Sequence, residues 1–107
     1  MIYVYGIPNC GSVKKARQLL EETNVAYTFV DFKKAPSTVQ QIEHWLDKVG
    51  AEKLINKKGT KWRSLTDEEK QLPATTVIAQ YPTVIKRPLI EWENGTITVG
   101  LDWTSKE

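Results

Sequence analysis

The sequence predicts an α/β fold built on a four-stranded mixed sheet. A strand, a helix and a second strand follow one another within about 30 residues at the N-terminus, the length of a βαβ unit. Near the C-terminus, two β-like runs flank Glu93-Asn94-Gly95, and Asn-Gly is the strongest short hairpin signal. Between these halves the apolar residues recur at helical spacing. With 107 residues the chain is expected to form one domain, 1–107, with a helical insertion at about 37–80.

The N-terminal part is predicted to form the βαβ unit. Residues 2–5 are rich in β-branched and aromatic side chains, which favours a buried first strand. Apolar residues at helical spacing then predict a helix from Val13 to Leu20, with Asn24 as its stop signal. Residues 25–32 predict the second strand, which ends at Asp31. A helical crossover makes the two strands parallel.

The middle of the chain is predicted to be helical. After a linker at 33–36, Ser37 to Gln40 has the form of a capping box, and Gly50 ends the helix that it starts. The predicted buried stripe of this helix consists of Val39, Ile42, Leu46 and Val49. Trp45 is placed at the edge of the stripe, and His44 is expected to be solvated. Further short helical segments are predicted at 51–55, 66–69 and 73–80.

Residues 56–63 form the most basic stretch of the chain and include Trp62. Two interpretations are open. The stretch is a solvated surface loop, since charged runs usually face water. Alternatively it handles anions, with Lys58 or Arg63 meeting a carboxylate or an oxyanion.

The C-terminal segment is predicted to form an antiparallel pair of strands, 89–92 and 96–99. Pro88 stands directly before the first of them, a position where a sheet accepts proline, and its peptide bond is of the kind that can be cis. A last helix is predicted to begin near Asp102, within 102–107.

Composition excludes several classes of function. The hydrophobic share of 40% and the charged share of 26% are those of an ordinary soluble globular protein. The net charge of +2 is spread along the chain, which argues against a nucleic-acid binder. No run is apolar enough to cross a membrane, and the N-terminus lacks a signal peptide's basic region. We therefore expect a cytoplasmic protein with no membrane association, and a monomer, since nothing suggests an obligate oligomer.

The single cysteine, Cys10, lies on a strand-to-helix turn rich in glycine, proline and asparagine. Unpaired N–H groups and the helix dipole stabilise an anion at such a position, and a thiolate's pKa falls there. Lys14 and Lys15 add positive charge one turn on. The alternative is an inert, buried cysteine. One cysteine cannot form an internal disulfide, and one cysteine with one histidine (His44) argues against a zinc site.

Three motifs together resemble the arsenate reductase-like (ArsC/Spx) family, nearest its short YffB-type branch. They are Tyr5 to Cys10 with Lys14 to Arg17, Leu54 to Thr60, and Ile85 to Ile90. The resemblance runs in order over nearly the whole chain and lacks only the final helix. It implies a thioredoxin-like fold and an oxidoreductase.

The resemblance also implies roles for individual residues. Cys10 is implied as the nucleophile that attacks a disulfide or an oxyanion, and glutathione or a glutaredoxin regenerates it. Arg87 is implied to bind the oxyanion or the glutathione carboxylate, and Pro88 to be the cis-proline whose backbone lies beside the sulfur. The other candidates for binding substrate or glutathione are Asn9, Gly11, Ser12, Lys58 and Arg63. No metal or bound cofactor is expected, with glutathione as co-substrate.

The sequence departs from the family pattern at three positions. The glutaredoxin-linked arsenate reductases use two further arginines, and none stands near Asn56 or near Gly100, which weighs against arsenate reduction. The second cysteine of the transcription-regulating branch is replaced by Val13, so an internal redox switch is impossible.

Three hypotheses follow. The first is a glutathione- or glutaredoxin-linked thiol/oxyanion reductase that uses Cys10 and an external resolving thiol. The second is a non-enzymatic regulatory protein similar to the branch that binds RNA polymerase, acting through a helical face and residues 56–63. The third is a protein that keeps the fold while Cys10 is merely buried.

Overall fold

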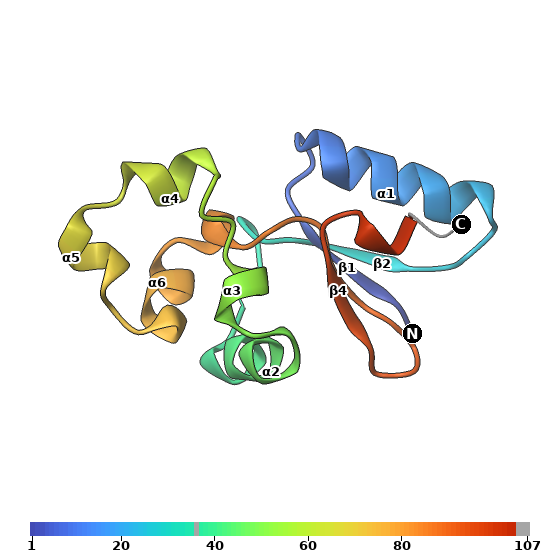
Figure 1. The fold of residues 1–107 in the computed structure, drawn as a ribbon. Helices are drawn as coiled ribbons and strands as arrows, with labels where there is room; N and C mark the ends of the chain where they lie inside the picture. Colours follow the sequence, from blue (N-terminus) through green and yellow to red (C-terminus); the bar gives the residue numbers. More distant parts are fainter. Residues whose placement is uncertain (36, 105–107) are drawn as a thin grey trace. The chain divides into compact units, whose positions relative to one another are not determined.

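The computed structural model describes residues 1–35 and 37–104, and the chain divides into two compact units. One unit consists of Met1–Ala35 and Arg87–Glu107, and the other of Pro36–Lys86. The first contains the sheet and the second contains most of the helices (Figure 1). The predicted single-domain organisation stays a prediction.

The first unit is built on a four-stranded mixed sheet in the order β2-β1-β3-β4. Its strands are β1 (Tyr3–Gly6), β2 (Thr28–Asp31), β3 (Leu89–Glu91) and β4 (Ile97–Val99). Strand β1 runs parallel to β2 and antiparallel to β3, and β3 and β4 form a hairpin. The predicted fold class, the βαβ unit and the terminal hairpin are therefore confirmed.

Helix α1 (Gly11–Glu22) connects β1 to β2 and buries Val13, Ala16 and Leu20, which recur at steps of three and four residues. Leu20 packs in a cluster with Ile2 and Val4 of the N-terminal segment and Ile90 of β3. The start of the helix lies close to the end of β1. A Cβ atom added at Gly6 would come within 2.6 Å of the Val13 side chain. Glycine at position 6 thus permits the tight strand-to-helix turn.

The second unit contains α2 (Val39–Val49), α3 (Ala51–Leu54), α4 (Thr60–Ser64), α5 (Asp67–Lys70), α6 (Ala74–Gln80) and the 3₁₀ turn η1 (Pro82–Val84). A capping box starts α2, but it lies one residue later than predicted. The Gln41 N–H donates to Thr38 Oγ1 at 3.1 Å, and the Thr38 N–H donates to Gln41 Oε1 at 3.0 Å. Ser37/Gln40 and Thr38/Gln41 both fit the sequence pattern, and the structure selects the second frame.

The predicted burial of α2 is partly wrong. Trp45 is fully buried, whereas Val39 is 52% exposed. The buried face is centred on Ile42 and Trp45, which lie three residues apart, because burying the large indole removes more apolar surface from water than burying Val39 would. His44 is exposed, as predicted. Gly50, with φ of +82°, ends the helix, also as predicted.

Residues 56–63 are not a loop throughout, since α4 begins at Thr60. Asn56 shapes the turn before it: its side-chain oxygen accepts the Lys58 N–H at 3.2 Å, and its own N–H donates to the Val84 carbonyl at 2.8 Å. The other short helices follow the predictions. Helix α5 has a capping box formed by Thr66 and Glu69, and α6 follows Pro73.

The terminal hairpin turns as its Asn-Gly pair predicts. Gly95 has φ of +90°, and the Asn94 side chain accepts the Thr96 N–H at 3.0 Å. After β4 the chain forms the 3₁₀ turn η2 (Asp102–Thr104). The rest of the predicted final helix lies outside the described residues.

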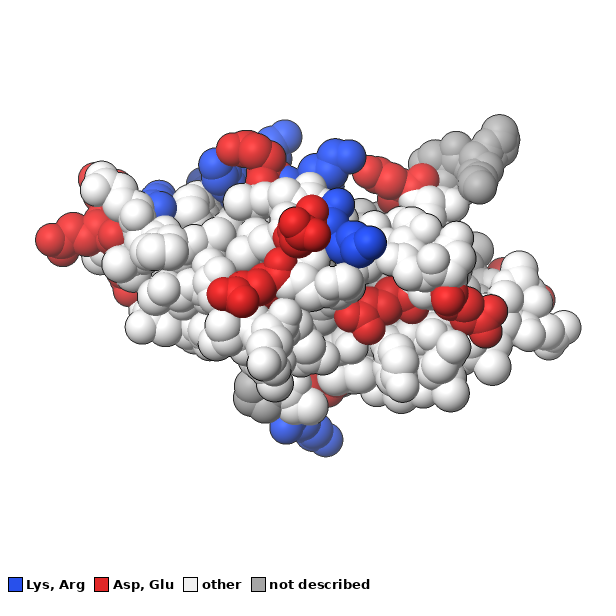
Figure 2. Space-filling view, turned by 90° about the horizontal axis from the view of Figure 1, so that it is seen from below, with Lys and Arg blue, Asp and Glu red and all other residues white. Residues whose placement is uncertain are grey.

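The charged side chains of both signs are interspersed on the face that Figure 2 displays. That face shows no broad area of one sign. Among residues 1–35 and 37–104, no helix has the length and apolar character needed to cross a membrane.

Candidate active site at Cys10

Cys10 occupies the N-cap position of α1, as the turn residues around it predicted. Its backbone is extended, with φ of −89° and ψ of 127°, and its carbonyl accepts the first helical hydrogen bond from the Lys14 N–H at 3.0 Å. The Cys10 N–H donates to the Ile7 carbonyl at 3.3 Å and so closes the turn from β1. The N–H groups of the first helical turn, which no helical carbonyl can satisfy, therefore lie beside the sulfur.

The sulfur has a perturbed acidity. Partial burial raises the pKa of the Cys10 thiol, but three groups lower it and prevail: the Val13 N–H, the Arg87 side chain and the Ser12 N–H. The result is a pKa below the ordinary value of a cysteine. These groups favour the charged form of the sulfur, the thiolate, over the neutral thiol.

Arg87 and Pro88 come to this site from the distant end of the sequence, directly before β3. The Arg87 guanidinium lowers the pKa of the Cys10 thiol through hydrogen bonding to the sulfur and a favourable charge interaction with the thiolate. The Arg87–Pro88 peptide bond is cis, as predicted. Pro88 is buried, and its carbonyl accepts the Gly100 N–H at 2.9 Å. Since proline has no N–H, the Pro88 backbone can offer a ligand only this carbonyl, which keeps a second lone pair.

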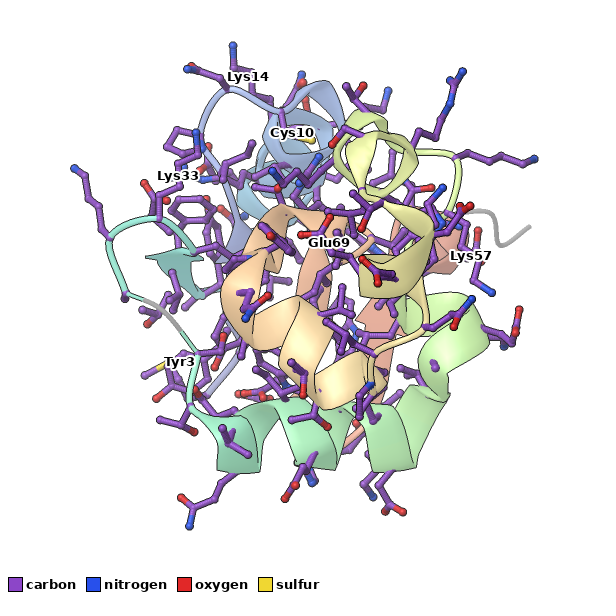
Figure 3. The ribbon with its side chains drawn as sticks, turned by 90° about the vertical axis from the view of Figure 1, so that its left-hand side faces the viewer. Tyr3, Cys10, Lys14, Lys33, Lys57 and Glu69 are labelled. Carbon is purple, nitrogen blue, oxygen red and sulfur yellow. The ribbon has the colours of Figure 1, made fainter. Side chains whose placement is uncertain are left out.

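The two lysines of α1 contribute differently from Arg87. Lys14 and Lys15 are exposed one turn after Cys10, and Figure 3 labels Cys10 and Lys14 beside α1, which is seen nearly end-on there. Solvent screens charges in such positions. The N–H groups and Arg87, rather than the lysines, account for the lowered pKa.

The remaining predicted site residues separate into two groups. Asn9 and Gly11 are exposed on either side of Cys10, and the Ser12 N–H faces the sulfur. Lys58 and Arg63 are exposed in the other unit. The assignment of these five residues to substrate or glutathione binding stays a prediction.

Sequence reasoning missed one group at the site. The sequence predicts Val13 as an apolar helix residue at the position of the regulatory branch's second cysteine, and its side chain is fully buried. Its backbone N–H is also the strongest of the groups that lower the Cys10 pKa. The signal was available, because an N-cap side chain accepts a hydrogen bond from the second or third helical residue, here Ser12 or Val13.

The family that the sequence resembles was expected to carry two further arginines near Asn56 and near Gly100, and both of these residues have backbone roles in this chain. Asn56 holds the turn before α4 with its side chain. Gly100 has φ of +73°, a conformation that a side chain such as arginine rarely adopts. Among the described residues, no group of three or more His, Cys, Asp and Glu side chains is placed to hold a metal ion.

Comparison with known proteins agrees with the geometry. The sequence model of the ArsC family matches residues 5–104. A solved structure of a YFFB protein is 33% identical, with a TM-score of 0.88, and the match covers 94% of this chain and 90% of that one.

Two other relatives represent different branches. The solved structure of an arsenate reductase (ArsC) related protein from Brucella melitensis is 34% identical, with a TM-score of 0.75, over 92% of this chain and 85% of that one. The global transcriptional regulator Spx 1 of Bacillus cereus is 27% identical over 84% of this chain and 72% of its own length. The fold, the cysteine turn and these matches agree, and the chain belongs to the ArsC family.

Proposed function

We propose that this protein is a thiol-dependent reductase of the ArsC family in which Cys10 is the nucleophile. The observation that carries the proposal is the position of the Cys10 sulfur, which faces two N–H groups and the Arg87 guanidinium. All three favour the thiolate, which is the form of cysteine that attacks disulfides. An inert buried cysteine would have no reason to meet such a set of groups, and Cys10 is only partly buried.

The proposed reaction begins with a mixed disulfide between glutathione and a small or protein thiol. The Cys10 thiolate attacks the glutathione sulfur, a new S–S bond forms to Cys10, and the other thiolate leaves with the electron pair of the broken bond. A second glutathione thiolate then attacks the Cys10–glutathione disulfide. This step releases oxidised glutathione and restores the Cys10 thiolate, so the net reaction converts the mixed disulfide and one free glutathione into the free substrate thiol and oxidised glutathione.

An external thiol is required because Cys10 is the sole cysteine of the sequence. A glutaredoxin is the alternative source of the resolving thiol. Arg87 is proposed to hold an anionic group of the incoming disulfide, such as a glutathione carboxylate, since a guanidinium binds carboxylates through two parallel hydrogen bonds. The Arg87 side chain would also stabilise the Cys10 thiolate each time this thiolate is released from its disulfide with glutathione.

Arsenate is a poorer substrate in this proposal than a disulfide. An arsenate oxyanion carries its charge on several oxygens and is held by several cationic donors at once. The guanidinium that lowers the Cys10 pKa is that of Arg87, and the sequence has no arginine near Gly100.

The test is an assay of the glutathione-dependent reduction of a glutathionylated peptide, in which the released peptide thiol is measured. We expect turnover by the wild-type protein and none above background with Cys10→Ser. The variant His44→Gln, which changes an exposed residue of α2, is the matched control and should keep full turnover. Equal rates for wild type and Cys10→Ser would refute the proposal.

A second candidate is a regulatory protein that acts by binding a protein partner. The similarity to Spx 1 of Bacillus cereus favours it, and RNA polymerase is the first partner to test. Binding of purified polymerase that persists in Cys10→Ser, together with an absence of turnover in the wild type, would favour this candidate over the reductase.

A further inference from the structure

A hollow on the hairpin side of the sheet unit is not used by the proposed reaction. It has a volume of about 520 Å³ and is lined by Ile2, Trp92, Glu93, Asn94, Thr96 and Trp103. All six residues belong to the unit that contains the sheet. Its volume lies within the range of small-molecule sites.

Two indole rings form the walls of this hollow. The rings of Trp92 and Trp103 lie with their centroids 5.2 Å apart and their planes inclined at 69°, so they meet as a corner. Each ring is fixed by its own N–H: the Trp92 Nε1–H donates to Thr98 Oγ1 at 2.9 Å, and the Trp103 Nε1–H donates to the Gly100 carbonyl at 3.1 Å. With these donors engaged inside the protein, the indoles offer a ligand their π surface.

The lining of the hollow contains one acidic side chain. Glu93 is the charged residue of the lining, and none of the described lining residues is lysine or arginine. The Glu93 carboxylate lies 3.8 Å from the N-terminal ammonium of Met1, and the two side chains are 73% and 61% exposed. An ion pair so exposed is weak, so the carboxylate can also interact with another cation.

Indole faces attract cations through their quadrupole, and methylated ammonium groups combine a positive charge with an apolar surface. We propose that the hollow formed by Trp92, Trp103 and Glu93 binds a small quaternary ammonium compound. The trimethylammonium group would lie against the two indoles, and the Glu93 carboxylate would balance its charge. The site does not involve Cys10, so the inference stands or falls independently of the proposed reductase activity.

The probe is choline, and its neutral analogue 3,3-dimethyl-1-butanol is the matched control ligand, because the two differ by the charged nitrogen at nearly constant shape. The readout is the indole N–H signals in nuclear magnetic resonance spectra of the full chain. The four tryptophans provide internal controls. Trp45 is fully buried, and Trp62 lies in the other unit, where Lys57 already approaches its ring at 5.9 Å.

We expect choline to shift the Trp92 and Trp103 signals saturably and to leave those of Trp45 and Trp62 in place. The affinity for the neutral alcohol should be about two- to fivefold lower than that for choline, which is the factor expected for an exposed cation–π contact. Glu93→Gln, a change at an exposed residue that should not disturb folding, should weaken choline about two- to fivefold and leave the alcohol unaffected. Glu43→Gln, on the exposed face of α2, should change neither.

Three results would overturn the inference. The first is equal binding of choline and the alcohol, which would make the hollow merely apolar. The second is the absence of a saturable shift at Trp92 and Trp103. The third is choline binding that Glu93→Gln does not weaken.

Discussion

The starts of α1 and α2 differ in how they treat the N–H groups of the first helical turn, which have no partner within the helix. Helix α2 begins with a complete capping box, in which Thr38 and Gln41 satisfy each other's N–H groups. Helix α1 begins with Cys10, whose side chain makes no capping hydrogen bond. The same difference separates α1 from α5, which Thr66 and Glu69 cap. The capped starts contribute stability, whereas the start of α1 keeps its N–H groups available for an anion.

The largest effect expected from this comparison concerns Arg87. Removing the guanidinium in Arg87→Ala takes a charge-assisted hydrogen bond from the thiolate and should raise the Cys10 pKa. We expect alkylation of Cys10 at neutral pH to slow about tenfold. Iodoacetamide labelling followed by mass spectrometry measures the rate.

The matched control for that variant is Arg17→Ala, which removes an arginine from α1 two turns beyond Cys10. Arg17 packs over the Phe29 ring at 4.2 Å and donates to the Tyr27 hydroxyl at 3.0 Å. Its loss should lower stability but leave the labelling rate of Cys10 unchanged. Equal slowing in both variants would mean that the Arg87 effect is structural.

The next effect concerns the capped helices. Thr38→Ala and Thr66→Ala each leave helix N–H groups without an acceptor and should lower the free energy of unfolding by about 1 kcal/mol. Urea denaturation measures this loss. Neither substitution should change the labelling rate of Cys10, and a change would show that the helix starts are not independent.

A smaller effect of opposite sign is expected at α1. A serine hydroxyl caps helices well, so Cys10→Ser should raise the free energy of unfolding by about 0.5 kcal/mol while it removes the reactive thiolate. Cys10→Ala, which cannot cap, is the control and should bring no such gain. If Cys10→Ser destabilises the protein in urea denaturation, the comparison between the two helix starts fails.

The smallest effect is a pH dependence of the stability that Cys10→Ser is expected to gain over the wild type. Because the folded-state pKa of Cys10 is lowered, ionisation favours the folded state. This contribution is complete above the unfolded-state pKa and is lost as pH falls through the folded-state pKa. The stability advantage of Cys10→Ser should therefore shrink as pH rises from neutral toward 9. An advantage that stays constant or grows over this window in urea denaturation would contradict the sign of the shift.

Local signals allowed most of the fold to be predicted. The turn residues before Val13 located the start of α1, and Asn94-Gly95 located the hairpin. The prediction failed where two local signals competed. Ser37 and Thr38 both begin a capping pattern, and in the folded protein Thr38 caps α2.

The candidate site was predictable to a different degree. The acidity of Cys10 followed from its place at a helix start. The approach of Arg87, which lies far along the sequence, was expected from the family resemblance and not from spacing or composition. The hollow between Trp92 and Trp103 was not foreseen, because a hairpin and a 3₁₀ turn must fold before the two indoles meet.

The most direct test of the account is the pKa of Cys10 in the folded protein, compared with its pKa in the same protein unfolded in urea. Thiolate absorbance against pH gives both values, with Cys10→Ser as the blank. The account predicts a lower pKa in the folded state, and a smaller difference in Arg87→Ala. A folded-state pKa equal to or above the unfolded one would mean that the start of α1 is not built for a thiolate.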